Sequence, residues 1–147
     1  MIGISNLADF KRQLKGIQDA LQAEAEGGAM ERVGETVHQA LLLLATYAAD
    51  YPPQPADSDY RRTGTLGRLW TTATPHMTMS GHVLDARIGN ATPYGPWVQD
   101  PERQGRVHRG RWQTTDEVVQ SHLGEVDALL AGAGLDIVER VAAQAGG

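Results

Sequence analysis

The sequence has little of several features that would restrict its class. It contains no cysteine, a single phenylalanine, and no apolar run longer than the six residues of Ala40–Ala45. The lack of cysteine excludes a disulfide framework and thiolate metal sites. The apolar run is far shorter than the ~20 residues that a membrane-spanning helix needs, so no membrane partner is expected. The 147 residues predict a single domain over residues 1–147.

Charge is distributed unevenly along the chain, although the net charge is only −5. Residues 1–50 sum to −3, residues 51–113 to +3 and residues 114–147 to −5, and every Lys/Arg position of the middle segment is arginine. Such asymmetry usually reflects surfaces for partners rather than the fold. A second interpretation stays open, in which the acidic ends and the basic middle pair within the fold.

The first fifty residues show the periodicity of two helices. Apolar residues spaced three and four apart predict a first helix over residues 4–26, with a narrow seam that fits either a helical hairpin or a neighbouring subunit. Gly27-Gly28 ends this helix, and a second, central buried helix is predicted over residues 30–50. Pro52-Pro53 stops it, because proline has no N–H to donate.

After a predicted loop over residues 52–64, the pattern changes to a period of two. Leu84, Ala86 and Ile88 alternate with charged residues, which is typical of a half-buried strand. We expect a β-hairpin in which residues 68–78 pair with residues 82–90, with Pro75 at an edge or a bulge. A basic extended loop is predicted over residues 100–113, with an irregular hairpin as the alternative.

The remaining chain predicts a helix over residues 115–130, because Thr114 can cap it and acidic residues fill its first turn. Gly132-Ala133-Gly134 should weaken or break it, and residues 144–147 are expected to form a flexible tail. The fold class is therefore α+β, with an N-terminal helical hairpin, a small antiparallel β-sheet in the middle and a C-terminal helix packed on it. The predicted core consists of Val37, Leu41, Leu44, Leu66, Leu84, Ile88, Val119 and Leu123.

No catalytic or metal-binding pattern is found in the sequence. It lacks a His-Glu-x-x-His zinc motif, a Gly-x-Ser-x-Gly nucleophile elbow and a phosphate-binding Gly-Lys-Ser/Thr loop. Asp85, Asp100 and Glu102 have the chemistry of acids and bases, but nearby arginines favour solvated ion pairs. We therefore expect no enzyme activity, no cofactor and no metal.

Five of the eight aromatic residues fall within residues 60–112, namely Tyr60, Trp70, Tyr94, Trp97 and Trp112. Together with arginine, Trp and Tyr are favoured at protein interfaces. Trp70 and Trp97 are expected to lie at least partly in the core, which leaves Trp112 as the better candidate for an interface.

Four arginines lie within nine residues, next to Trp112 and with His108 among them: Arg103, Arg106, Arg109 and Arg111. Their guanidinium groups suit phosphates of a nucleic acid. They suit equally the carboxylates of a neighbouring subunit, which the acidic ends of the same chain would supply. A third interpretation is a solvated charged loop without a partner.

Two short motifs flank the predicted hairpin. Thr63-Gly64-Thr65-Leu66 follows the helical half, and Tyr94-Gly95-Pro96-Trp97-Val98-Gln99 follows the second strand. In this order the sequence resembles the small head–tail joining proteins of long-tailed bacteriophages, called neck, tail-completion or virion-morphogenesis proteins, including those similar to the lambda minor tail protein Z. The chain departs from the family in two places: Gln99-Asp100-Pro101 replaces a Glu-aromatic-Gly ending, and Gly67 replaces a common arginine.

The resemblance implies a structural virion protein, assembled in the host bacterial cytoplasm. It would form a homo-oligomeric ring, with a hexamer as the expected order, at the head–tail junction or the top of the tail. Its implied partners are further copies of itself, head-closure or connector proteins, tail-tube or tail-terminator proteins, and DNA that passes through the ring without sequence recognition. The alternative is a nucleic-acid-binding or regulatory protein that uses the arginines of residues 103–111.

The resemblance also gives the first motif a role. Gly64 would provide a turn, Leu66 would anchor the start of the first strand in the core, and Arg61 and Arg62 would face a partner. The plainer interpretation is an ordinary entry from loop to strand with solvated arginines.

Overall fold

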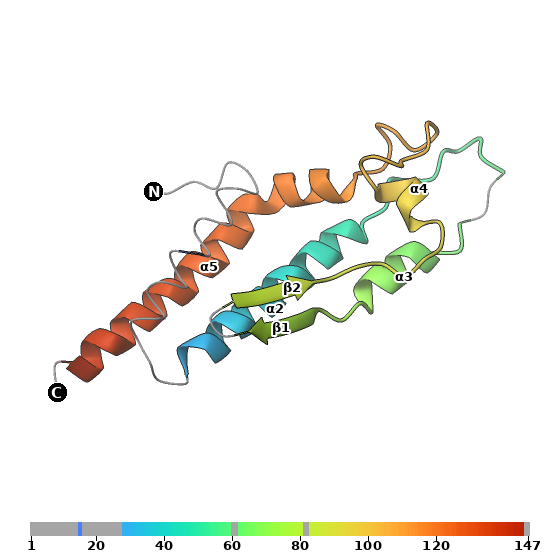
Figure 1. The fold of residues 1–147 in the computed structure, drawn as a ribbon. Coiled ribbons are helices and arrows are strands. Elements are labelled where there is room, and N and C mark those ends of the chain that lie inside the picture. Colours follow the sequence, from blue (N-terminus) through green and yellow to red (C-terminus); the bar gives the residue numbers. More distant parts are fainter. Residues whose placement is uncertain (1–14, 16–27, 60–61, 81–82, 146–147) are drawn as a thin grey trace. The chain divides into compact units, whose positions relative to one another are not determined.

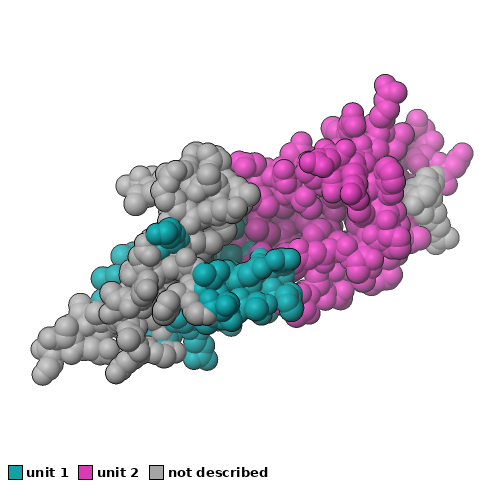
Figure 2. Space-filling view, viewed as in Figure 1, with its two compact units in different colours: residues 1–40, 76–87, 122–147 teal, residues 41–75, 88–121 magenta. Residues whose placement is uncertain are grey.

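The structure, a computed structural model, describes residues 15, 28–59, 62–80 and 83–145 (Figure 1). The chain divides into two compact units (Figure 2). Unit 1 comprises residues 1–40, 76–87 and 122–147, and unit 2 comprises residues 41–75 and 88–121. Helices combine with one two-stranded antiparallel sheet in the described residues, so the predicted α+β class is confirmed.

Helix α2 (Ala29–Ala48) confirms the predicted second helix, and it ends four residues before Pro52. Its buried side chains in unit 1 are Val33, Val37 and Ala40, which recur every three or four residues. Leu42 is 38% exposed, so the predicted central helix is not buried on every side. The predicted first helix lies outside the described residues apart from Lys15, which is helical.

The predicted β-hairpin is confirmed in unit 1, where β1 (His76–Ser80) and β2 (Val83–Arg87) run side by side (Figure 1). Their antiparallel register pairs His76 with Arg87 and Ser80 with Val83. Leu84 and Ala86 are half-buried while the residues between them are exposed, as the period of two indicates. The first strand is shorter than predicted and begins directly after Pro75.

Residues 65–71 correct the sequence prediction. The range 68–78 was expected to be strand, but Thr65–Thr71 form helix α3. Leu66 and Trp70 lie one helical turn apart, and both are buried. Leu66 therefore anchors the start of a helix in the core, and not the start of a strand.

Helix α5 (Thr115–Ala145) begins where the sequence predicts, with a reciprocal cap. The Thr114 N–H donates to Glu117 Oε2 at 2.8 Å, and the Glu117 N–H donates to Thr114 Oγ1 at 3.2 Å. The prediction of a break at Gly132-Ala133-Gly134 is wrong, because the helix continues through Ala145 and so includes residues 144 and 145 of the predicted tail. A helix tolerates glycine at about 1 kcal/mol each when its other residues favour the conformation.

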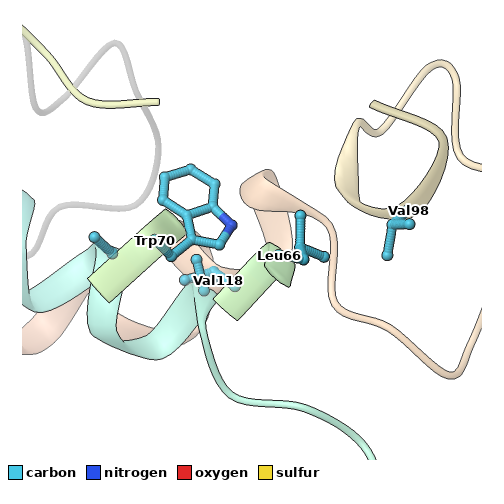
Figure 3. Packing of buried hydrophobic residues seen from close by; sticks show 6 residues of the cluster. Leu66, Trp70, Val98 and Val118 are labelled. Atoms are coloured by element: carbon cyan, nitrogen blue, oxygen red, sulfur yellow. The ribbon is translucent and has the colours of Figure 1, made fainter. Parts of the chain in front are cut away.

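The core of unit 2 joins four helices through one cluster of buried side chains (Figure 3). Leu66 and Trp70 project from α3, Val98 from α4 (Gly95–Gln99), Val118 from α5, and Ala45 and Ala48 from the last turns of α2. A buried amide completes the cluster. Trp70 Nε1 donates to Gln99 Oε1 at 2.7 Å, and Gln99 Nε2 donates to the Ala48 carbonyl at 2.9 Å.

The predicted core is confirmed at two positions, Val37 and Leu66, which are both buried. The other six predicted residues are only half-buried: Leu41, Leu44, Leu84, Ile88, Val119 and Leu123. Smaller or neighbouring residues replace them in the core, such as Ala45 beside Leu44 and Val118 beside Val119. None of the described helices is long and apolar enough to cross a membrane.

Replacing Leu66 with alanine should lower the free energy of unfolding by ~2–5 kcal/mol, because a packed leucine leaves a cavity when it is truncated. Leu66 is 4% exposed and belongs to the unit 2 cluster. Urea unfolding followed by far-UV circular dichroism measures the loss. The matched control is Leu42→Ala, at an exposed position, which should change the free energy of unfolding by less than about 1 kcal/mol. Equal losses for the two variants would contradict this assignment of the core.

The Arg87 side chain should control the ionisation of Asp85. Its guanidinium donates to both carboxylate oxygens, at 3.1 Å from Nε and 2.5 Å from Nη2, and this hydrogen bonding lowers the pKa of Asp85. The pair therefore exists above the usual pKa of aspartate and is lost as the pH falls through the lowered pKa. Arg87→Ala should raise the pKa of Asp85 in an NMR titration, while Arg68→Ala should leave it unchanged. An unchanged pKa in Arg87→Ala would reject the pairing.

Candidate functional site

A surface pocket in unit 2 brings together most of the residues that the sequence singled out. Its volume is about 740 Å³. Three segments line it: the loop and helix start over residues 51–66, helix α4, and residues 107–112. The last of these belongs to the basic segment of residues 100–113, which we call the arginine loop. The lining includes Arg62, Thr63, Gly64, Leu66, Tyr94, Trp97, Arg111 and Trp112.

The two motifs of the resemblance are joined by Asn90. Its Nδ2 donates to the Leu66 carbonyl at 2.7 Å, and its Oδ1 accepts from the Thr92 backbone N–H at 2.9 Å. A Cβ atom added to Gly95 would lie 2.7 Å from Thr92 Oγ1 and 3.7 Å from Leu66 Cδ1, so glycine permits this close packing. Segments around residues 64 and 95, about thirty residues apart in sequence, thus form one wall of the pocket.

Gly64 makes the turn that the sequence predicts. Its φ of +70° lies in the left-handed region, and it occupies the N-cap position of α3. The hydroxyl groups of Thr63 and Thr65 lie 3.0 Å apart on either side of it. The turn therefore directs two hydroxyl groups and the start of α3 to the pocket.

Another part of the lining is built around Trp112, which is half-buried. The Tyr51 ring meets it edge-on at 5.1 Å between centroids, and the Arg62 guanidinium lies 5.2 Å from its ring centroid. Arg62 Nη1 also donates to the Pro52 carbonyl. These contacts fix Arg62 over an aromatic face, so it is not the solvated arginine of the plainer interpretation.

Tyr51 also explains one departure from the family pattern. Its hydroxyl oxygen accepts a hydrogen bond from the Gly67 backbone N–H. A Cβ atom at position 67 would lie 2.6 Å from this oxygen, which is closer than real Cβ contacts come. Any larger residue at position 67 would therefore have to displace the Tyr51 hydroxyl group from this contact.

The arginine loop is folded rather than extended, which corrects the prediction for residues 100–113. Asp100 Oδ1 accepts from the N–H groups of Glu102 and Arg103, both at 2.9 Å, and this starts a series of turns. The buried Gln104 holds the loop together, because its Nε2 donates to the Val98 carbonyl at 2.8 Å and to the Trp112 carbonyl at 2.9 Å.

The four arginines of this loop are all exposed. Arg111 lines the pocket, whereas Arg103, Arg106 and Arg109 lie outside its lining. Arg109 Nε donates to the Gln104 carbonyl at 3.2 Å. Within unit 2, none of the four forms an ion pair with a described carboxylate. Arg61 lies outside the described residues.

The tryptophans are not distributed between the core and the surface as predicted. Trp70 is buried in the core as expected, but Trp97 is 61% exposed, so its predicted place in the core is wrong. Trp97 lies on α4 beside the buried Val98 and Gln99, and the short helix turns its side chain away from them. Trp97 and the 42% exposed Tyr94 therefore form the accessible aromatic rim of the pocket.

Sequence reasoning missed the polar residues that support the site, namely Tyr51, Asn90, Gln99 and Gln104. The signal for Gln99 is a lone amide directly after the apolar Trp97-Val98 pair. Gln104 is surrounded by charged residues in the sequence and gives no such signal.

The lining contains two guanidinium groups, the His108 imidazole, several aromatic rings and three prolines, but no carboxylate. Such a surface attracts groups that combine a negative charge with an apolar body. In the described part of the chain, no group of three or more side chains is arranged to hold a metal ion.

Comparisons with known proteins found no match for this chain among family models, curated proteins or solved structures.

Removing the Gln104 amide should loosen the arginine loop. Gln104→Ala eliminates the side-chain donor to two carbonyl groups and should cost about 1–3 kcal/mol of unfolding free energy. Amide hydrogen exchange of residues 100–112 should become faster than in the wild type. The control is Gln113→Ala, an exposed position in the same loop, for which neither quantity should change. Unaltered exchange in Gln104→Ala would show that the loop keeps its shape without this amide.

Proposed function

We propose that this chain is a structural virion protein of a tailed phage. It forms a homo-oligomeric ring at the head–tail junction or the top of the tail, and the ring leaves a channel for DNA. Head-closure or connector proteins and tail-tube or tail-terminator proteins are its neighbours in the virion.

The observation that carries the proposal is the convergence of the motifs on one pocket. Gly64 and Leu66 of the first motif, Tyr94 and Trp97 of the second, and Trp112 of the arginine loop all line it. Exposed Trp and Tyr rings next to arginine are the side chains most enriched at the centres of protein interfaces. The resemblance and the surface chemistry therefore favour the same role, which is assembly with other proteins.

The distribution of charge supports a ring. Unit 1 contains six Lys/Arg and eleven Asp/Glu residues, a net charge of −5, whereas unit 2 contains seven of each and is neutral. A closed ring needs two different complementary surfaces on each subunit. An acidic unit and a unit that exposes arginines meet this need, and every contact is repeated around the ring. Single ion pairs of this kind are worth only ~0–1 kcal/mol, so repetition matters.

The four exposed arginines also favour a second candidate, contact with nucleic acid. Guanidinium groups without carboxylate partners within unit 2 are free to bind phosphates. In a virion, the same groups would then face the DNA in the channel. Reversing the charges should prevent the joining of heads to tails in the first role, and should impair DNA retention or ejection in the second.

Replacing Arg106, Arg109 and Arg111 together with glutamate should produce a folded protein that no longer joins heads to tails. All three side chains are exposed, so circular dichroism should match the wild type. The measurement is complementation of a gene deletion in the phage that carries the gene, with electron microscopy of the lysate. Separate heads and tails are expected for the deletion and for the triple variant.

The control is Arg68→Glu, an exposed charge reversal on α3 outside the pocket lining, which should restore joined virions. Intact virions from the deletion itself would reject the proposed function. Joined virions that lose DNA or fail to eject it in the triple variant would indicate instead that the arginines line the DNA channel.

A further inference from the structure

Helix α5 has a second apolar face that no part of the described chain covers. Ala128, Ala131, Leu135 and Val138 are spaced three, four and three residues apart, and all four are exposed. Leu135 is 64% and Val138 60% exposed. At 3.6 residues per turn this stripe lies opposite the buried residues Val126, Leu130 and Ile137.

Carboxylates outnumber cations along this helix. Helix α5 contains six Asp/Glu residues and one arginine, Arg140, which directly follows Glu139. Asp136 lies 3.9 Å from Arg32 of α2. Asp127 and the exposed Glu139 lie on opposite borders of the stripe in the helical period. The face thus combines aliphatic anchors with carboxylates, and carboxylates are what the unit 2 pocket lacks.

The pocket offers the complementary set. Its lining has Trp97, Tyr94 and Val107 as exposed apolar groups, and no carboxylate. Arg62 is already held by Trp112 and the Pro52 carbonyl, whereas Arg111 is exposed at the rim. A volume of about 740 Å³ accommodates a few side chains at one edge of a helix.

We propose that the pocket of one subunit receives the Leu135–Glu139 edge of α5 from a second copy of this chain. Leu135 and Val138 pack on the aromatic rim, and the Glu139 carboxylate pairs with Arg111. This is recognition of an amphipathic helix by a groove, with anchors three or four residues apart. The inference rests on the proposed ring and names its subunit contact.

A second copy is the occupant that the chain itself supports, because both complementary surfaces belong to the same sequence. The contact is heterologous, since the pocket of one subunit meets the helix of the next. Repetition of such a contact closes a ring when the rotation between subunits permits it.

The test uses two variants, each of which disables one side of the contact. Arg111→Glu places a carboxylate against Glu139, and Leu135→Gln/Val138→Gln removes the anchors with a residue that favours helix. Both change only exposed side chains, and circular dichroism checks that the fold is kept. Light scattering on a sizing column gives the mass of each protein over a range of concentrations.

The wild type should associate with increasing concentration, and each variant should need at least about tenfold more protein to do so. An equimolar mixture of the two variants should form a dimer with one copy of each and nothing larger. In that dimer the intact helix of Arg111→Glu occupies the intact pocket of the double variant, while the two remaining surfaces are both disabled.

Two matched controls should associate like the wild type. Arg103→Glu reverses an exposed charge of the same loop outside the pocket lining, and Met79→Gln/Val83→Gln removes an exposed apolar pair on the hairpin. A wild type that stays monomeric, a mixture that forms no dimer, or association lost only in the hairpin control would each overturn the inference.

The failure of the proposed function would be seen separately. Intact virions from the gene deletion would reject the role in the neck, and the mass measurements would still test the subunit contact. Wild-type rings whose mass is unaffected by the two variants would reject this subunit contact and leave the role in the neck standing.

Discussion

The Gln99 side chain connects parts of unit 2 that are far apart in the sequence. Its carbonyl accepts from Trp70 on α3, and its amide donates to the Ala48 carbonyl at the end of α2, fifty-one residues away. Gln99 is 4% exposed, so an unpaired donor or acceptor there would cost the full desolvation penalty. The two bonds therefore fix α2, α3 and α4 in one arrangement, and the pocket inherits its walls from that arrangement.

A second buried amide, that of Gln104, holds the arginine loop at the surface. Gln104 holds the carbonyl groups of Val98 and Trp112, so the arginine loop is attached to the helix that contains Gln99. A flexible loop would lose side-chain and backbone entropy when a partner binds, and this loss reduces affinity. Because buried hydrogen bonds have already ordered the loop, Trp112 and Arg111 are presented to a partner at a lower entropic cost.

The features that could be predicted from the sequence are those with local causes. The start of α5 follows from Thr114 and Glu117, which cap each other three residues apart, and the end of α2 follows from Pro52-Pro53. Helix α3 was missed because its threonines favour strand, while the burial of Leu66 and Trp70 against other helices decides the conformation. The break expected at Gly132-Ala133-Gly134 did not occur. The cost in helix propensity of about 1 kcal/mol per glycine is smaller than the free energy that a long helix gains by packing.

The candidate site likewise contains residues that a local pattern predicts and residues that depend on distant contacts. Arg62, Trp112 and the two motifs were selected from the sequence, since arginine and aromatic residues in a basic segment are typical of interfaces. Their convergence depends on the contact of Asn90 with Leu66 and that of Tyr51 with Gly67, which join residues 24 and 16 positions apart and leave no local pattern. The exposure of Trp97 depends likewise on which face of a five-residue helix carries Val98 into the core.

Two contacts in the middle of the chain use properties that arginine has and lysine lacks. Arg62 lies over the Trp112 ring, and Arg87 engages both oxygens of Asp85. A planar guanidinium stacks on an aromatic ring and binds a carboxylate through two bonds at once, and it is more weakly hydrated than the ammonium group of lysine. Lysine would offer a strongly hydrated point charge, which suits solvent better than a contact that excludes water. Of the eight arginines of residues 51–113, Arg62 makes such a contact, and Arg62 and Arg111 line a pocket without carboxylates.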